Sequence, residues 1–275
     1  MWDPATYLRY GDERSRPFHD LIARVAADRP ATVVDLGCGP GNLTVTLADR
    51  WPDARIVGVD SSPEMIDRAA SLGSAVEFTI GDLRDFTPGP EIDVLVTNAA
   101  LQWVPDHGTL LTRWAGELTP GSWIAVQMPN NFDAASHRTL RQLAAEARWR
   151  ELVAPVLRAD PVRAVGDYVD LMAGAGCAVD AWETTYVHLL PAPEAASPVP
   201  PSGRVEQPGR AEHPVLTWLD GTALRPVRAA LGGPGPLWDR FRAELGVRLA
   251  EAYPVHGGRV QFPYRRVFFV ARTGA

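Results

Sequence analysis

The chain has 275 residues, of which 46% are hydrophobic and 22% are charged, enough for one large domain or a core with a second lobe. Its net charge of −6 gives no general attraction to nucleic acid, and no apolar run approaches the roughly 20 residues that a membrane span needs. We therefore expect neither nucleic acid nor a membrane as partner. The two cysteines, Cys38 and Cys177, form no disulfide framework and no zinc-ligand spacing, so we expect no metal and a cytoplasmic location.

The first 30 residues are predicted to form an N-terminal lid and a helix. Their start is aromatic, with Trp2, Tyr7 and Tyr10, and the polar residues of both signs that follow are unlike a signal peptide. Residues 18–27 have the pattern of an amphipathic helix. Two interpretations stay open: the aromatic residues pack on a sheet, or the segment covers a ligand cleft in which Arg14 or Arg16 pairs with an acidic substrate.

A glycine-rich turn follows the first predicted strand. Val33 and Val34 lead into Asp35, three glycines alternate behind it, and residues 43–50 have an amphipathic helical pattern. Glycine permits positive φ and close approach of a ligand to the backbone, and a helix beyond offers free N–H groups. The spacing Asp-x-Gly-x-Gly-x-Gly differs from the dinucleotide fingerprint Gly-x-Gly-x-x-Gly, which argues against an NAD dehydrogenase. A tight turn without a ligand is the alternative.

Further polar residues, two acids and an amide, follow or end the next predicted strands. The predicted strand 55–60 ends in Asp60, 19 residues after Gly41, where an acidic residue can meet ribose hydroxyls. Asp82 follows strand 76–80, and Asn98 follows strand 92–96. This order resembles the class I methyltransferases, which bind S-adenosylmethionine. The resemblance implies a cofactor site made of Asp35, Gly37, Gly39, Gly41, Asp60, Ser61, Asp82, Leu83 and Asn98, with Asp82 at the adenine amino group.

The alternation of strands and helices through strand 123–128 predicts an α/β fold. We expect a Rossmann-like, doubly wound, mostly parallel sheet with helices on both faces, and residues 31–130 as the S-adenosylmethionine-binding core. Ligands on such sheets bind at the carboxyl ends of the strands. Asp35, Asp60, Asp82 and Asn98 all stand at those ends.

The rest of the chain is predicted to form a mainly helical cap, residues 131–258. Residues 191–214 are rich in Pro, Ala, Ser and Gly and predict a surface insertion or loop. Residues 259–275 contain a strand that could complete the core sheet. The other elements expected in the cap are helices at 136–157, 166–173, 215–219, 224–231 and 237–252 and a strand at 182–190.

Six motifs spread over nearly the whole chain resemble the trans-aconitate 2-methyltransferase family. The resemblance implies methyl transfer from S-adenosylmethionine to one carboxylate of trans-aconitate, giving a monomethyl ester. The stretch 191–213 is longer than expected for the family, which bears on the cap and on the acid accepted. The motifs are residues 7–17, 35–42, 98–107, 127–131, 218–226 and 262–266.

A carboxylate acceptor sets the expected chemistry. Carboxylic acids are ionised at neutral pH, so the reaction needs positioning and no catalytic base, triad or metal. We expect His107 to be a first-turn helix residue and not a base, and we favour Arg225 and then Arg16 as substrate ligands. The full set of candidates that the resemblance implies is Arg14, Arg16, His19, Trp103, Asn130, His137, Arg225, Tyr264 and Arg265.

Two other functions stay open. The chain could methylate another small acid or a natural product, or it could bind S-adenosylmethionine without turnover. A small-molecule polycarboxylate is the expected partner, and no obligate protein partner is evident.

Overall fold

The computed structural model describes residues 11–157, 162–192 and 212–274. These residues divide into two compact units, which we name by their content. The sheet unit holds residues 11–130, 162–184 and 265–274, and the helical unit holds residues 131–157, 185–192 and 212–264. Residues 1–10 of the expected N-terminal lid and helix, and most of the expected insertion at 191–214, lie outside the described residues.

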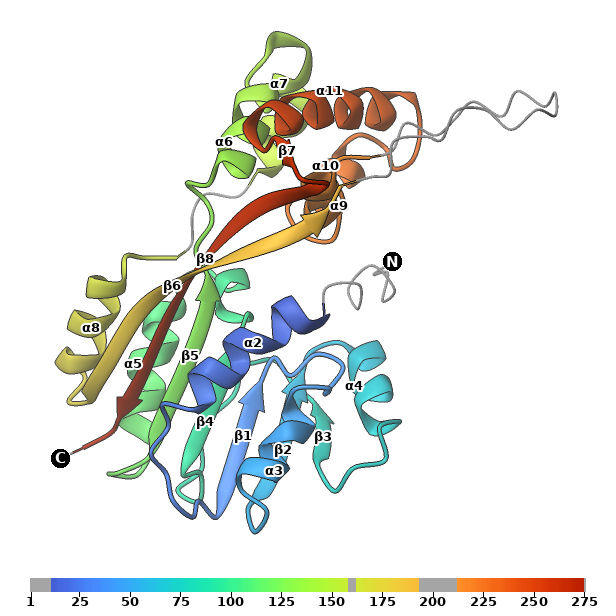
Figure 1. The fold of residues 1–275 in the computed structure, drawn as a ribbon. Coiled ribbons are helices and arrows are strands. Elements are labelled where there is room, and N and C mark those ends of the chain that lie inside the picture. The colour runs from blue at the N-terminus through green and yellow to red at the C-terminus, as the bar shows by residue number, and fades with distance from the viewer. Residues whose placement is uncertain (1–10, 158–161, 193–211, 275) are drawn as a thin grey trace. The chain divides into compact units, whose positions relative to one another are not determined.

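The central sheet has the strand order β3-β2-β1-β4-β5-β8-β6 (Figure 1). Its first five strands in the chain run parallel, whereas β8 is antiparallel to β5. This arrangement confirms the predicted Rossmann-like, mostly parallel sheet. The strands are β1 (Thr32–Leu36), β2 (Arg55–Asp60), β3 (Glu77–Ile80), β4 (Val94–Asn98), β5 (Trp123–Pro129), β6 (Ala178–Pro191) and β8 (Arg259–Arg272), and the short β7 (Val255–His256) pairs with β8.

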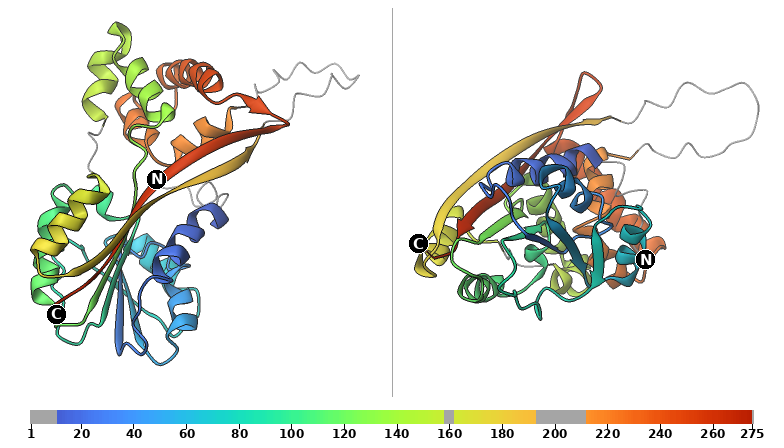
Figure 2. Two further views of the ribbon diagram at one scale, coloured as in Figure 1. Left: turned by 60° about the vertical axis from the view of Figure 1, so that its left-hand side comes forward. Right: turned by 90° about the horizontal axis from the view of Figure 1, so that it is seen from below.

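Helices cover both faces of the sheet, as predicted. The helix α2 (Gly11–Ile22) packs on β5 from one face, and α5 (His107–Glu117) lies on the other face (Figure 2), where it contacts α8 (Val165–Gly174). The helix α4 (Pro63–Ala70) starts as expected, with the Ser62 hydroxyl accepting from the Met65 N–H and Pro63 in the first turn. His107 is the first residue of α5, also as expected.

Two helices near the N-terminus differ from the sequence prediction. The helix predicted at 18–27 begins at Gly11 and ends at Ile22. The prediction missed its first turns because the charged stretch before Phe18 lacks apolar periodicity. Pro17 lies inside the helix and does not end it. The segment predicted as one helix at 43–50 is a 3₁₀ turn, η1 (Thr44–Thr46), followed by the single-turn α3 (Leu47–Arg50). Amphipathic spacing alone does not separate these two helix types.

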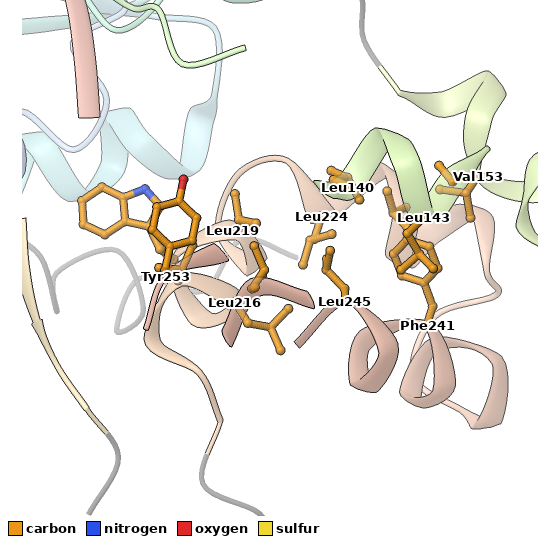
Figure 3. Close-up of a cluster of buried hydrophobic side chains, with 14 of the residues drawn as sticks. Leu140, Leu143, Val153, Leu216, Leu219, Leu224, Phe241, Leu245 and Tyr253 are labelled. Atoms are coloured by element: carbon orange, nitrogen blue, oxygen red, sulfur yellow. The ribbon is translucent and has the colours of Figure 1, made fainter. Parts of the chain in front are cut away.

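The helical unit has its own hydrophobic core (Figure 3). Leucine and aromatic side chains from α6 (Ala135–Ala144), α7 (Ala147–Val153), α9 (Pro214–Asp220), α10 (Leu224–Ala230) and α11 (Pro236–Ala252) meet in it. Within it the ring of Trp149 stands edge-on to Phe241, with 5.1 Å between the centroids. No helix in the described ranges is long and apolar enough to cross a bilayer.

The single helix predicted at 136–157 is wrong. Glu146 separates α6 from α7 with a ψ of 144°, which is extended backbone, and a 3₁₀ turn, η3 (Ala154–Val156), follows α7. The break turns α7 so that its buried Trp149 reaches the core while the carboxylate of Glu146 faces α11. Tertiary packing thus overrides a continuous helical pattern.

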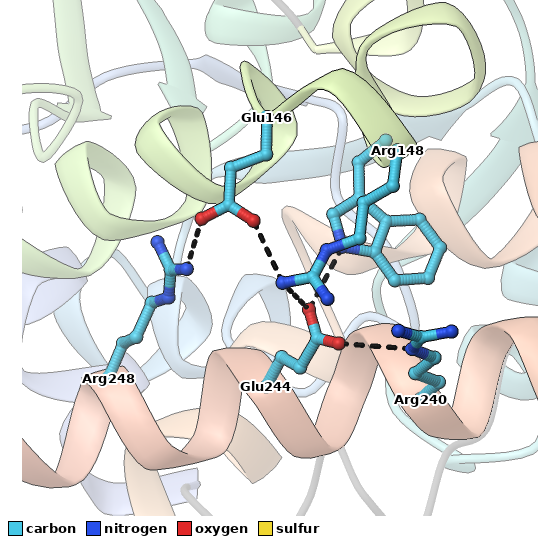
Figure 4. Close-up of polar contacts among 6 residues, drawn as sticks. Glu146, Arg148, Arg240, Glu244 and Arg248 are labelled. Carbon is cyan, nitrogen blue, oxygen red and sulfur yellow. Dashed lines mark hydrogen bonds and ion pairs between the residues drawn. The ribbon is translucent and has the colours of Figure 1, made fainter.

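Charged side chains join α7 to α11 (Figure 4). Glu146 pairs with Arg148 at 2.8 Å and with Arg248, and Glu244 pairs with Arg148 at 2.9 Å and Arg240 at 3.2 Å. The Trp149 indole N–H also donates to the Glu244 carboxylate at 3.0 Å. Because Trp149 is buried, this last bond matters most for stability.

We expect Glu244→Ala to lower the free energy of unfolding by about 1–3 kcal/mol, since the buried Trp149 N–H loses its acceptor. Urea titration followed by tryptophan fluorescence would measure the change. Glu64→Ala is the matched control, because Glu64 pairs with Arg68 on an exposed face of α4 and its loss should cost under about 1 kcal/mol. Equal losses in the two variants would contradict the role given to Glu244.

Candidate functional site

The turn after β1 is held open by glycines at positive φ. Gly37, Gly39 and Gly41 have φ values of 79°, 55° and 77°. A Cβ on Gly37 would lie 2.4 Å from the Cβ of Ala100, so only glycine fits there. At Gly39 a Cβ would meet nothing within 4 Å. The middle of the turn is therefore open to a ligand, while its two ends are packed.

Asp60 joins this turn to the turn after β2. Its Oδ2 accepts from the Gly39 N–H at 2.9 Å, and its Oδ1 accepts from the Ser62 N–H at 2.9 Å. A carboxylate oxygen can accept more than one hydrogen bond, so both oxygens retain capacity for a ligand's hydroxyl groups. Ser61, which lies between Asp60 and Ser62 in the chain, is exposed. This geometry suits the ribose role that the sequence assigns to Asp60.

Asp35 is much more enclosed than Asp60. It is only 3% exposed, and its Oδ2 accepts from the Thr44 hydroxyl at 2.7 Å. Burial raises the pKa of Asp35 to about 6, the Thr44 bond opposes the rise, and the nearby charge of Asp60 adds to it. Asp35 therefore places a buried negative charge behind the glycine turn at neutral pH.

The loop after β4 touches the same turn. Ala99 has a φ of 55°, a left-handed conformation that is uncommon outside glycine, and its N–H donates to the Gln127 carbonyl at 2.9 Å. The Gln102 side chain donates to the Ala99 carbonyl at 2.6 Å. Among the described residues, the buried Oδ1 of Asn98 has no hydrogen-bond partner. A ligand at the strand ends could satisfy it.

The site predicted after β3 is more exposed. Asp82 accepts from the Arg84 backbone N–H at 2.9 Å and from its guanidinium Nε at 3.0 Å. The Arg84 side chain, through this bond, lowers the pKa of Asp82, so the group stays an ionised acceptor. Leu83 is half-buried and approaches the turn, within 4.0 Å of the Cβ position of Gly37. The structure thus brings Leu83 to the glycine turn.

Five of the candidate acceptor ligands have described side chains in the sheet unit. Arg16 and His19 are exposed on α2, and Arg16 is paired with Asp20. Trp103, in the 3₁₀ turn η2 (Leu101–Trp103), is 54% exposed, unusual for an indole. The other two, Asn130 and Arg265, are joined: the Asn130 N–H donates to the Arg265 carbonyl, and Arg265 Nε donates back to the Asn130 carbonyl at 3.1 Å. The side chain of Arg14 lies outside the described residues.

The remaining candidates belong to the helical unit. Arg225 is exposed near the start of α10. Tyr264 joins an aromatic cluster, with its ring centroid 5.5 Å from that of Trp218. Burial lowers the pKa of His137 to about 4, so at neutral pH it can donate a hydrogen bond but carries no positive charge. No groups of three or more His, Cys, Asp or Glu that could hold a metal are found in the described part of the chain.

Sequence reasoning missed one polar pair at the strand ends. Gln127 is fully buried in β5, beside Asn98 on β4, and its Oε1 accepts from Arg266 Nη1 at 3.1 Å. Gln127 is a lone amide in an otherwise apolar strand, and this signal could have identified it. Its pairing with Arg266 could not be read from the sequence, because 139 residues separate the two.

Comparison with known proteins shows which family the chain belongs to. Residues 33–121 match the model of a methyltransferase domain. A trans-aconitate 2-methyltransferase of Mycobacterium sp. (strain KMS) is 52% identical over 277 aligned residues, covering 100% of both chains. The chain belongs to the trans-aconitate 2-methyltransferase family. The protein of that name from Mycobacterium tuberculosis (strain ATCC 25177 / H37Ra) is 47% identical, covering 100% of this chain and 97% of that one.

A solved structure gives independent support for the fold. The YcgJ protein of Bacillus subtilis superposes with a TM-score of 0.55 at 12% identity, covering 93% of this chain and 97% of that one. At this identity the likeness concerns the fold alone. By contrast, the similarity to the trans-aconitate 2-methyltransferase family extends over the sequence of both units.

We expect Gly39→Ala to weaken binding of S-adenosylmethionine by tenfold or more, because its methyl group would project into the open part of the turn. Gly73→Ala is the matched control, since Gly73 also has a positive φ and open surroundings but lies before β3, at the opposite edge of the sheet. Both variants should lose about 1–2 kcal/mol of stability from backbone strain. Calorimetry that finds equal affinities in the two variants would remove Gly39 from the ligand surface.

The raised pKa of Asp35 gives two pH-dependent predictions. The folded protein binds this proton more tightly than the unfolded chain, so the stability contribution of Asp35 is present below pH 4 and is lost as the pH rises to about 6. Asp35→Asn removes the cost of burying a charge. At pH 7.5 the variant should therefore be more stable than the wild type, by roughly 1–3 kcal/mol.

The same variant should bind the cofactor less well. An ionised Asp35 attracts the ammonium group of a methionine moiety. The affinity of the wild type for S-adenosylmethionine should therefore fall as the pH drops from 7 to 5. The affinity of Asp35→Asn should be weaker than that of the wild type at pH 7 and should not change across this range. Calorimetric titrations at several pH values would measure both. An unchanged affinity in Asp35→Asn would show that Asp35 serves only the fold.

Proposed function

We propose that this protein transfers a methyl group from S-adenosylmethionine to one carboxylate of trans-aconitate, giving a monomethyl ester. The observation that carries the proposal is the 52% identity, over the whole of both chains, with a trans-aconitate 2-methyltransferase. Because that identity includes the helical unit, it extends well beyond the methyltransferase domain at residues 33–121.

We also propose the cytoplasm as the location of this protein, from its low cysteine content.

The residues at the strand ends fit S-adenosylmethionine. The open surface at Gly39 allows close approach, the Asp60 carboxylate can accept from ribose hydroxyls, and Asp35 sets a negative potential for an ammonium group. Asp82, Leu83 and Asn98 complete the proposed set with Gly37, Gly41 and Ser61. When bound, this cofactor supplies a methyl group on a positively charged sulfur.

The protein's own task is to position the acceptor. A carboxylate is already an anion at neutral pH, so no side chain has to remove a proton, and the rate gain comes from holding an oxygen in line with the methyl group at roughly 3 Å. His107 agrees with this view: it is buried, bonded to the Tyr168 hydroxyl at 2.7 Å, and burial lowers its pKa. We therefore propose that it stabilises the packing of α5 on α8 and does not act as a base.

Fixed cations and polar groups should hold the remaining carboxylates of the acceptor. We propose Arg225 and Arg16 as the leading ligands, since a guanidinium can pair bidentately with a carboxylate. Asn130, Arg265, Trp103, His19, Tyr264, His137 and Arg14 are the further members of the proposed set. Neutral His137 can contribute a hydrogen bond only.

A direct assay tests the function. Incubation with methyl-labelled S-adenosylmethionine and trans-aconitate should yield a labelled, base-labile ester, whose mass identifies a monomethyl product. A panel of other di- and tricarboxylates and hydroxylated natural products would distinguish the wider alternatives. Labelled product from another acceptor, with none from trans-aconitate, would overturn the proposed substrate, and tight cofactor binding with no product from any acceptor would favour a non-catalytic binding protein.

Arg225→Ala should raise the KM for trans-aconitate by about 10- to 100-fold while leaving the Kd for S-adenosylhomocysteine unchanged, because a charge-assisted hydrogen bond is lost at the acceptor only. Arg228→Ala, on the same helix, is the matched control, since Arg228 instead stacks on Trp238. Asp60→Ala should show the opposite pattern, a weaker Kd for the cofactor product. A reversal of these effects between Arg225 and Asp60 would show that their roles are misassigned.

A further inference from the structure

Gln127 is a buried polar side chain of which the fold uses only the amide oxygen, among the described residues. It is fully buried near the carboxyl end of β5, and its strand neighbour in register is Asn98 on β4. Residues paired in register on adjacent strands point to the same face, and successive residues alternate, so Gln127 shares a face with Asn98 and not with Thr97. Gln127 therefore extends the row of strand-end polar groups by one strand.

Arg266 fixes which way the Gln127 amide points. The guanidinium can only donate, and its Nη1 donates to Oε1 of Gln127 at 3.1 Å. The oxygen end of the amide therefore faces Arg266, and the Nε2 hydrogens are directed elsewhere. Arg266 is itself only 5% exposed, so its place is set by the surrounding packing. The result is an amide donor held in one orientation.

That donor has no acceptor among the described residues. Gln127 Nε2 is buried without a hydrogen-bond partner, and so is the neighbouring Asn98 Oδ1. Folded proteins rarely leave buried polar atoms unsatisfied, so each such atom calls for a water, an ion or a ligand that supplies the missing partner. The Gln127 main chain also holds the Ala99 N–H of the loop after β4. The main chain and the side chain of Gln127 thus both lie at the carboxyl ends of β4 and β5.

We infer that Gln127 recognises the acceptor: its Nε2 group donates a hydrogen bond to a carboxylate of the polycarboxylate substrate. Arg266 is a positioning residue that acts through Gln127 by holding the amide oxygen. The inference deepens the proposed function and rests on it, since it names a residue that contacts the acceptor. Both residues belong to the sheet unit, which also carries the cofactor residues.

Gln127→Glu separates this role from a purely structural one. The substitution is nearly isosteric and keeps an oxygen for Arg266, so a structural role predicts unchanged or stronger pairing and unchanged kinetics. It also replaces the amide donor by an anionic oxygen, which would repel a carboxylate. We expect the KM for trans-aconitate to rise on the order of 10- to 100-fold, with an unchanged Kd for S-adenosylhomocysteine.

Thr97→Val is the matched control, because Thr97 is equally buried on β4 but points to the opposite face. Its KM should equal that of the wild type. If Gln127→Glu fails to fold, as judged by circular dichroism and cofactor affinity, Gln127→Met replaces it; it keeps the side-chain volume and removes the donor, and its KM should rise about tenfold.

The outcomes separate the inference from the function. An active wild type with equal KM values in the wild type and the Gln127 variant would overturn this inference and leave the proposed function standing. A wild type that methylates no polycarboxylate would overturn both. A raised KM for Gln127→Glu that is matched by an equal loss of cofactor affinity would also overturn the inference, since it would mean general damage to the strand ends.

Discussion

The close approach of Gly37 and Ala100 is the constraint on which the arrangement of the strand ends depends. The sheet order reverses at β1, with β2 on one side and β4 on the other, and the loops after β1 and β4 meet there. A side chain at Gly37 would collide with Ala100, so the turn after β1 must be glycine for the two loops to approach. Open α/β sheets bind ligands at this kind of reversal point.

The loop after β4, which supplies Ala100 to the contact with Gly37, contains a strained residue. Ala99 adopts a left-handed conformation that costs on the order of 1–2 kcal/mol for a residue with a Cβ. Its N–H bond to the Gln127 carbonyl compensates part of that cost and anchors the loop to β5. The ends of three adjacent strands, β1, β4 and β5, are thus linked by a few direct contacts.

The charges at this edge differ in their access to solvent. Asp35 is buried behind the turn, whereas Asp60 spans the surface between two turns and uses both oxygens to hold backbone N–H groups. Burial, and after it the charges of these two acids, raise the pKa of the Cys38 thiol, so Cys38 stays protonated and is a poor nucleophile at neutral pH.

The sequence alone determined the parallel sheet, the order of its strands along the chain and the polar residues at their ends, because apolar runs, glycine spacing and capping residues are local signals. The tertiary structure alone decided that α6 and α7 are separate helices, since Trp149 packs on Phe241 far away in the chain. It also decided the pairing of Gln127 with Arg266 and the burial of Asp35, because these depend on which strands become neighbours. Periodicity reports the face on which a side chain lies, and only packing across the sheet sets what that side chain meets.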